Sequence, residues 1–103
     1  MFAKQTEQKI NEVIAAELTN ACNTYGKNYH SLHEGYAVLL EEFEEAEQDF
    51  DYMKNHLAML WDNVKLDDTT TVKANARAIA FDAASLAKEA CQIAAVARKI
   101  LGD

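Results

Sequence analysis

The sequence predicts an all-α protein, a three-helix antiparallel bundle whose second and third helices are long. The 103 residues include no proline and only three glycines, the two residue types that interrupt helices most strongly. Half of the residues are hydrophobic, which argues against intrinsic disorder. A chain of this length forms one domain. We therefore expect residues 1–103 to form a single all-α domain that assembles into an oligomeric helical bundle.

The first helix is expected over residues 4–23, where apolar residues recur on one face at helical spacing. This face consists of Ile10, Val13, Ile14, Leu18 and Ala21. Glu17 lies inside the same face, and we interpret its carboxylate as reaching solvent at the edge of the face; the alternative is a role at a site. Gly26 then ends the helix. Ser31 and Glu34, three residues apart, form a capping box that opens the next helix.

The second helix is expected to run from Leu32 to about Leu66, with apolar residues that step by four and three without interruption, as in a coiled coil. These residues are Leu32, Tyr36, Leu39, Phe43, Ala46, Phe50, Met53, Leu57, Leu60 and Val64. Such a helix is about 50 Å long, so a monomer would cover its apolar face poorly. We expect a homodimer or a homotetramer. An oligomeric coiled-coil scaffold without chemistry remains an alternative.

The third helix follows a polar turn at residues 67–71, which also supplies caps. Its apolar residues alternate small and large at the same spacing, and Gly102 ends it. They are Ala76, Ile79, Ala83, Leu86, Ala90, Ile93, Ala97 and Ile100. We expect this helix to pack antiparallel to the second, because the connection between the two is short.

Two pairs of oxygen-bearing side chains flank these apolar faces, Glu42 with Glu45 and Glu89 with Gln92. Residues three apart share a helix face. The two pairs lie at nearly equal distances from the turn, so antiparallel packing would bring them together. Carboxylate and amide oxygens are suitable ligands for a hard divalent cation. The spacing predicts a metal site, and the alternative is an ordinary acidic helix surface.

The whole-chain composition limits the possible partners. The net charge of −7 argues against binding of nucleic acid, which requires clustered Lys and Arg, but it allows a phosphorylated small molecule bound with Mg²⁺. Residues 1–10 lack the apolar stretch of a signal peptide, and the aliphatic run at 37–40 is too short to span a membrane. We interpret Cys22 and Cys91 as buried thiols in a reducing cytoplasm. A soluble, cytoplasmic protein is expected.

A resemblance to a known family lies in two segments, HEGYAVLLEEFEEA at 33–46 and KEACQIAAVAR at 88–98. Together they resemble the all-α nucleoside triphosphate pyrophosphatase superfamily, specifically the small MazG-like proteins frequent in phages and prophages. The first segment matches the E-E-x-x-E helix motif of that family, and the second matches its E-x-x-D helix in placement. The resemblance extends over residues 17–100, with the stretch between the motifs matching mainly in helical pattern.

The resemblance implies a dimeric or tetrameric bundle that binds Mg²⁺, with Mn²⁺ as an alternative, and hydrolyses a nucleoside triphosphate to the monophosphate and pyrophosphate. Its metal ligands on this chain would be Glu42, Glu45, Glu89 and the residue at position 92. Glu41 and Glu42 would be the catalytic residues, with Glu41 orienting the ligands or the attacking water. The cell would be a bacterium or a phage-infected host.

One position departs from the family, because Gln92 stands where the motif ends in Asp. An amide oxygen can coordinate a cation, but it carries no charge and cannot act as a base. Asp49 or Asp82 would have to compensate. Gln92 therefore raises the question of a degenerate enzyme, and two alternatives stay open: a non-catalytic protein that sequesters a nucleotide, and a structural helical oligomer.

Candidates for substrate binding cluster around the first connection. They are Lys27, Tyr29, His30 and His33. An aromatic ring there would stack on a base and the cations would bind phosphate, although packing and capping are the alternative roles. Arg98 and Lys99 suit the carboxyl end of the third helix without any ligand.

Overall fold

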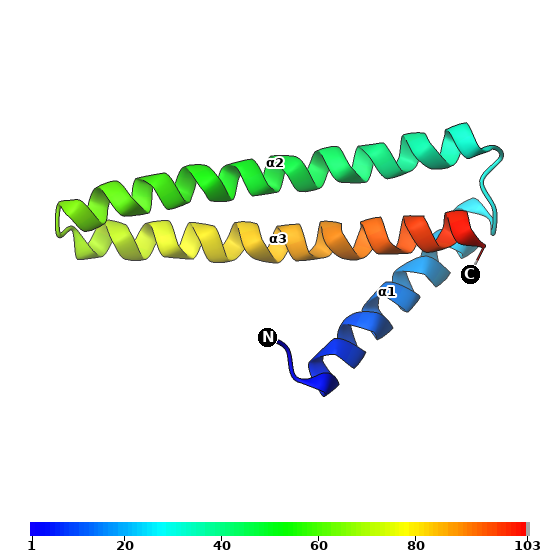
Figure 1. The fold of residues 1–103 in the computed structure, drawn as a ribbon, viewed down its shortest axis with the longest axis horizontal. Helices are drawn as coiled ribbons and strands as arrows, with labels where there is room; N and C mark the ends of the chain where they lie inside the picture. The colour runs from blue at the N-terminus through cyan, green and yellow to red at the C-terminus, as the bar shows by residue number, and fades with distance from the viewer. Residues whose placement is uncertain (103) are drawn as a thin grey trace. The chain divides into compact units, whose positions relative to one another are not determined.

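The computed structural model describes residues 1–102, except for the side chain of Tyr25. It contains three α-helices and, within that part of the chain, no strand (Figure 1). The helices are α1 (Lys4–Tyr25), α2 (Leu32–Lys65) and α3 (Thr69–Leu101). The long helices α2 and α3 pack heavily against each other. The predicted all-α class and the three predicted helices are thus confirmed.

The first helix ends where the glycine predicts. The N–H of Gly26 donates to the carbonyl oxygen of Cys22 at 2.9 Å, and Gly26 has a φ of 92°. A residue with a Cβ is strained at such a φ, so Gly26 stops α1 two residues beyond the expected end at Asn23. Cys22 and Cys91 are both free thiols.

Side-chain caps define the starts of the two long helices. The N–H of Glu34 donates to Ser31 Oγ at 3.1 Å, as the capping box predicts. The carboxylate of Glu34 accepts the N–H of His30 at 3.0 Å instead of the N–H of Ser31. At the start of α3, Asp68 accepts the backbone N–H and the hydroxyl of Thr71 at 3.1 and 2.7 Å.

The chain divides into two compact units. The three-helix unit comprises Met1–Phe43 and Glu89–Asp103, and the hairpin unit comprises Glu44–Lys88. The helices α2 and α3 each contribute to both units. The buried hydrophobic residues of the described chain all belong to the three-helix unit. They are Leu18, Ala95 and Val96.

A close helix approach marks the three-helix unit. Gly35, near the start of α2, is buried, and a Cβ at this position would lie 3.1 Å from Ile100 Cγ1 near the end of α3. That separation is shorter than ordinary van der Waals contact. Glycine therefore lets the start of α2 lie directly against the end of α3.

The hairpin unit buries polar residues instead of hydrophobic ones. Its buried residues, within the described chain, are the polar Asn75 and Asp82. An apolar column on α2 remains exposed, as expected for a helix whose apolar face a single copy covers poorly. The apolar column consists of Phe50, Leu57 and Val64, which are 49%, 60% and 41% exposed. Two helices can cover each other along only one face, which leaves this column outside.

Candidate metal centre

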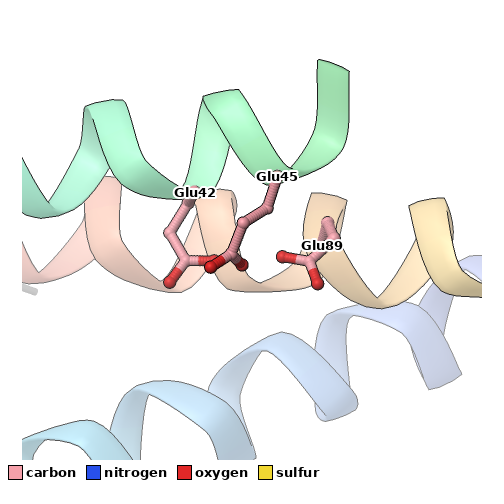
Figure 2. A group of neighbouring side chains, drawn as sticks. All are labelled: Glu42, Glu45 and Glu89. Atoms are coloured by element: carbon pink, nitrogen blue, oxygen red, sulfur yellow. The ribbon is translucent and has the colours of Figure 1, made fainter. Parts of the chain in front are cut away.

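Three carboxylates converge where α2 faces α3. Glu42, Glu45 and Glu89 each offer one oxygen, and these oxygens all lie within 4.8 Å of one another (Figure 2). Glu42 and Glu89 belong to the three-helix unit, and Glu45 follows Glu42 by one turn of α2. We call these three residues the acidic cluster. The predicted convergence is confirmed for three of the four positions.

The acidic cluster contains an unsatisfied oxygen. Glu89 Oε2 is buried and has no hydrogen-bond partner in the described part of the chain. A buried polar atom without a partner costs about 1–3 kcal/mol, and neighbouring carboxylates add repulsion. A cation would remove both penalties at once.

The donor set fits a hard divalent cation. Oxygen ligands of one octahedral Mg²⁺ at 2.0–2.1 Å lie roughly 3–4 Å apart, which small rotamer changes can reach from the observed cluster. Carboxylate oxygens without any sulfur or imidazole favour Mg²⁺ or Mn²⁺ over softer metals. The residues present therefore fit a magnesium-type site.

The fourth predicted position makes a contact that the sequence does not reveal. Gln92 Nε2 donates to Glu17 Oε2 at 2.9 Å, and both side chains are half-buried. Glu17 thus turns from solvent toward α3, contrary to the interpretation of its carboxylate as reaching solvent. The place of Glu17 inside the apolar face of α1 was the sequence signal that could have indicated this contact. The hydrogen bond places the Glu17 carboxylate of α1 beside Gln92, which is the one amide among the four predicted metal-binding positions.

The two carboxylates expected to compensate for Gln92 have other partners within the hairpin unit. Asp49 Oδ2 accepts the hydroxyl of Ser85 at 2.9 Å, and Asp82 Oδ2 lies 2.7 Å from His56 Nδ1. A third contact joins two amides nearer the turn. We call the following the three polar pairs: Asp49–Ser85, His56–Asp82 and Asn63–Asn75.

The predicted catalytic and substrate-binding residues occupy different surroundings. Glu41 is exposed and is not a member of the acidic cluster, so its role stays a prediction. His30 is exposed and pairs with Glu34 at 2.9 Å, and this hydrogen bond is the main cause that lowers the pKa of Glu34. His33 is also exposed. Lys27 lines a cavity of the three-helix unit.

Tyr29 lies in a more enclosed position. Burial is the main cause that raises its pKa above 10.0, and the charges of Cys22, Glu34 and Glu42 raise it further. Tyr29 therefore feels the field of the acidic cluster through Glu42. A neutral phenol that resists ionisation suits a position beside negative groups.

Lys99 is the residue that the sequence interpretation missed. Only 3% of it is exposed, and its Nζ lies 4.2 Å from the centroid of the Tyr29 ring. The signal was its spacing, because Lys99 follows the buried Ala95 and Val96 by four and three residues and so continues their face. The interaction of a charge with the helix dipole does not require such burial.

The comparisons with known proteins identify no relative: no family model, curated protein or solved structure matches the chain. The resemblance to MazG-like proteins rests on the two motif segments alone. None of the helices in residues 1–102 is long and apolar enough to cross a bilayer.

Proposed function

We propose that this protein is a Mg²⁺-dependent nucleoside triphosphate pyrophosphohydrolase of the MazG-like type, which releases a nucleoside monophosphate and pyrophosphate. The observation that carries the proposal is the acidic cluster with the buried, unbonded oxygen of Glu89. A cluster of like charges weakens the fold unless a cation neutralises it. The matching spacing of the two motif segments supports the choice of phosphate chemistry.

The side chains would divide the work as follows. Glu42, Glu45 and Glu89 would hold the metal, which polarises phosphoryl oxygens and lowers the pKa of bound water. Glu41, adjacent to Glu42, would orient the attacking water from the exposed side of α2. Mn²⁺ would replace Mg²⁺ at the same oxygens.

Gln92 and Glu17 would together replace the missing Asp. The amide group of Gln92 donates its N–H to Glu17, so its carbonyl oxygen points away from that bond and remains able to bind a cation. The carboxylate of Glu17 supplies a nearby negative charge, which attracts the cation without needing to touch it. On this account Glu17→Gln weakens metal binding, whereas loss of Asp49 or Asp82 does not.

A nucleotide hydrolysis assay tests the proposal. The wild-type protein is incubated with a panel of ribo- and deoxyribonucleoside triphosphates and Mg²⁺, and pyrophosphate is measured. We expect pyrophosphate from at least one nucleotide, none with Glu89→Gln, and a higher rate with Gln92→Asp. Orthophosphate as the product, or equal rates for wild type and Glu89→Gln, would contradict it.

Gln92 favours a second candidate function, a protein that binds a nucleotide without hydrolysing it. This candidate predicts calorimetric binding of a triphosphate by wild type and turnover only in Gln92→Asp. A purely structural oligomer would show a melting temperature that responds to neither Mg²⁺ nor nucleotide, because a specific ligand stabilises the folded state that binds it.

We further propose that the protein acts as a homodimer or homotetramer in the cytoplasm of a bacterium or phage-infected cell. The support for an oligomer is the apolar column of α2 in the hairpin unit, which stays exposed in a single copy.

The apolar column of α2 is the natural contact for a second copy. Each of its members directly follows a member of the three polar pairs, as Leu57 follows His56. The same holds on α3, where Ala76 follows Asn75 and Ala83 follows Asp82. In two antiparallel helices, the residue that follows a contact residue lies on the same side of the helix pair in both helices. Large and small apolar residues therefore share one face, and a two-fold axis can bring the large residues of one copy onto the small residues of another.

A further inference from the structure

We propose that the three-helix unit binds a phosphate group in a recess at the N-terminus of α2, with Lys99 as its cation. The recess has a volume of about 260 Å³. Its lining residues come from the first connection, the start of α2 and the end of α3. They include Asn28, Tyr29, Ser31, Gly35 and Lys99.

Lys99 is a buried cation with an incomplete set of partners. Only 3% of Lys99 is exposed. In the described part of the chain, no carboxylate forms an ion pair with it. Its close contact is the Tyr29 ring at 4.2 Å, and the charge of the Glu34 carboxylate, which is hydrogen-bonded to His30, compensates it in part from a longer distance. A cation–π contact contributes only about 0.5–2 kcal/mol, which does not replace the hydration that a buried ammonium loses. An anion in the recess would supply the missing charge.

The backbone adds donors at the same place. The N–H groups of Leu32 and His33 belong to the first turn of α2, where the helix has no carbonyl to accept them. The positive end of the helix dipole lies here too. Helix N-termini of this kind bind phosphate, and in this case the buried Lys99 provides an independent positive charge.

Side chains in the recess suit the same ligand. Ser31 Oγ accepts the N–H of Glu34, which leaves its hydroxyl hydrogen able to donate. The amide of Asn28 offers two more donors. Glu34 is the one negative group of the first turn, and its carboxylate is engaged by His30 through two contacts.

The size of the recess selects a phosphate or pyrophosphate group over a whole nucleotide. Sites for complete small-molecule ligands usually measure about 300–1,000 Å³. A second cavity of about 380 Å³ also reaches Lys99 and is lined by Lys27, so a larger ligand would extend past the same ammonium. Free phosphate, pyrophosphate and the end of a nucleotide share this chemistry. The inference does not rest on the proposed hydrolysis, because no metal is needed.

The test is an NMR titration of amide signals with inorganic phosphate, pyrophosphate and a nucleoside triphosphate, all in EDTA so that the acidic cluster holds no metal. We expect the signals of Leu32 and His33 to shift at millimolar ligand, and Lys99→Met to weaken binding by about tenfold or more, as for loss of a charge-assisted hydrogen bond. Lys88→Met, the same change at an exposed position of α3, should bind like wild type. Tighter binding of the triphosphate than of pyrophosphate would identify a nucleotide as the source of the group.

Two results would overturn the inference. One is a wild-type titration in which no ligand shifts Leu32 or His33. The other is equal binding by Lys99→Met and Lys88→Met. The melting temperature distinguishes a structural role of Lys99. Without ligand, Lys99→Met should melt no lower than wild type, because it removes a buried charge that is only partly compensated. If Lys99→Met does not fold, Lys99 is structural and the inference fails unless Lys99→Arg folds and still shifts the same two signals.

Discussion

The polar residues at every seventh position of α2 meet two different environments. Asp49, His56 and Asn63 lie in the hairpin unit, and each bonds a complementary side chain of α3 at 2.7–2.9 Å. Glu42 lies in the three-helix unit and meets Glu45 and Glu89 instead. The helix positions are equivalent, but Asp49, His56 and Asn63 each bond a complementary side chain, whereas Glu42 has two further carboxylates close by. Carboxylates gathered in this way suit a cation, which is the difference that the proposed metal centre depends on.

The apolar residues differ between the units in the same sense. The three-helix unit buries Leu18, Ala95 and Val96, although Tyr36 and Phe43 of its α2 segment are 65% and 53% exposed. The hairpin unit buries no hydrophobic residue among those described, and its apolar column is exposed as well. A third helix completes one core, and the hairpin unit has none. The proposed second copy would complete the hairpin unit, and four substitutions test this difference between the units.

The largest effect should come from Leu57→Glu. A charge placed in the centre of the apolar column cannot be buried against another copy without about 3 kcal/mol or more of cost. Sedimentation should show at least a hundredfold weaker association. Met59→Glu, at an exposed position that is 50% accessible on the other side of α2, is the matched control and should associate like wild type. Equal sedimentation of the two variants would refute the proposed interface.

The second change compares two acid-to-amide substitutions in EDTA. Asp82→Asn weakens the 2.7 Å contact with His56 and should lower the free energy of unfolding by about 1–2 kcal/mol. Glu89→Gln removes repulsion and lets the new amide donate to a neighbouring carboxylate, so it should raise stability by about 1 kcal/mol. Urea unfolding measures both. If both variants raise or both lower the free energy of unfolding, the two units do not differ in the way described.

A smaller effect is expected at the amide pair. Asn75→Leu alone leaves the Asn63 side chain with only its bond to the Met59 carbonyl and should cost about 1–2 kcal/mol. The double change Asn63→Leu with Asn75→Leu should recover most of this loss, because both polar partners leave together. A double-mutant cycle by thermal unfolding gives the coupling. Additive losses would mean that the pair does not hold the hairpin together.

The smallest effect should appear at the start of α3. The hydrogen bond from the Thr71 hydroxyl is the main cause that lowers the pKa of Asp68 below 3.8. The stabilisation is therefore complete above pH 3.8 and is lost as the pH falls through the lowered value. Asp68→Asn keeps a good N-cap and should melt like wild type at neutral pH but lose less stability on acidification. A steeper acid loss in the variant would contradict the cap assignment.

The sequence predicts the helices well because their ends are local. Gly26 and Ser31 mark ends through their own backbone and capping chemistry, within a few residues of chain. The acidic cluster was also predictable, since Glu42 and Glu45 share a face and a short turn sets the register of Glu89. These features depend on spacing along one or two helices.

Long-range contacts could not be predicted in the same way. The heptad pattern predicts that a monomer covers the apolar face of α2 poorly, but it does not state which residues of that face stay exposed, such as Leu57, or which element would cover them. The contact of Glu17 with Gln92 and the burial of Lys99 both depend on how α1 packs on α3. No spacing within a single helix contains that information.

Electron paramagnetic resonance of bound Mn²⁺, with competition by Mg²⁺, tests the proposed metal centre itself. Wild type should bind Mn²⁺ at one site, and Glu89→Gln should weaken this binding by about tenfold or more, because one charged ligand is lost. Asp82→Asn, the same chemical change in the hairpin unit, should leave the affinity unchanged. Equal affinity in wild type and Glu89→Gln, or an equal loss in both variants, would contradict a metal centre at Glu42, Glu45 and Glu89.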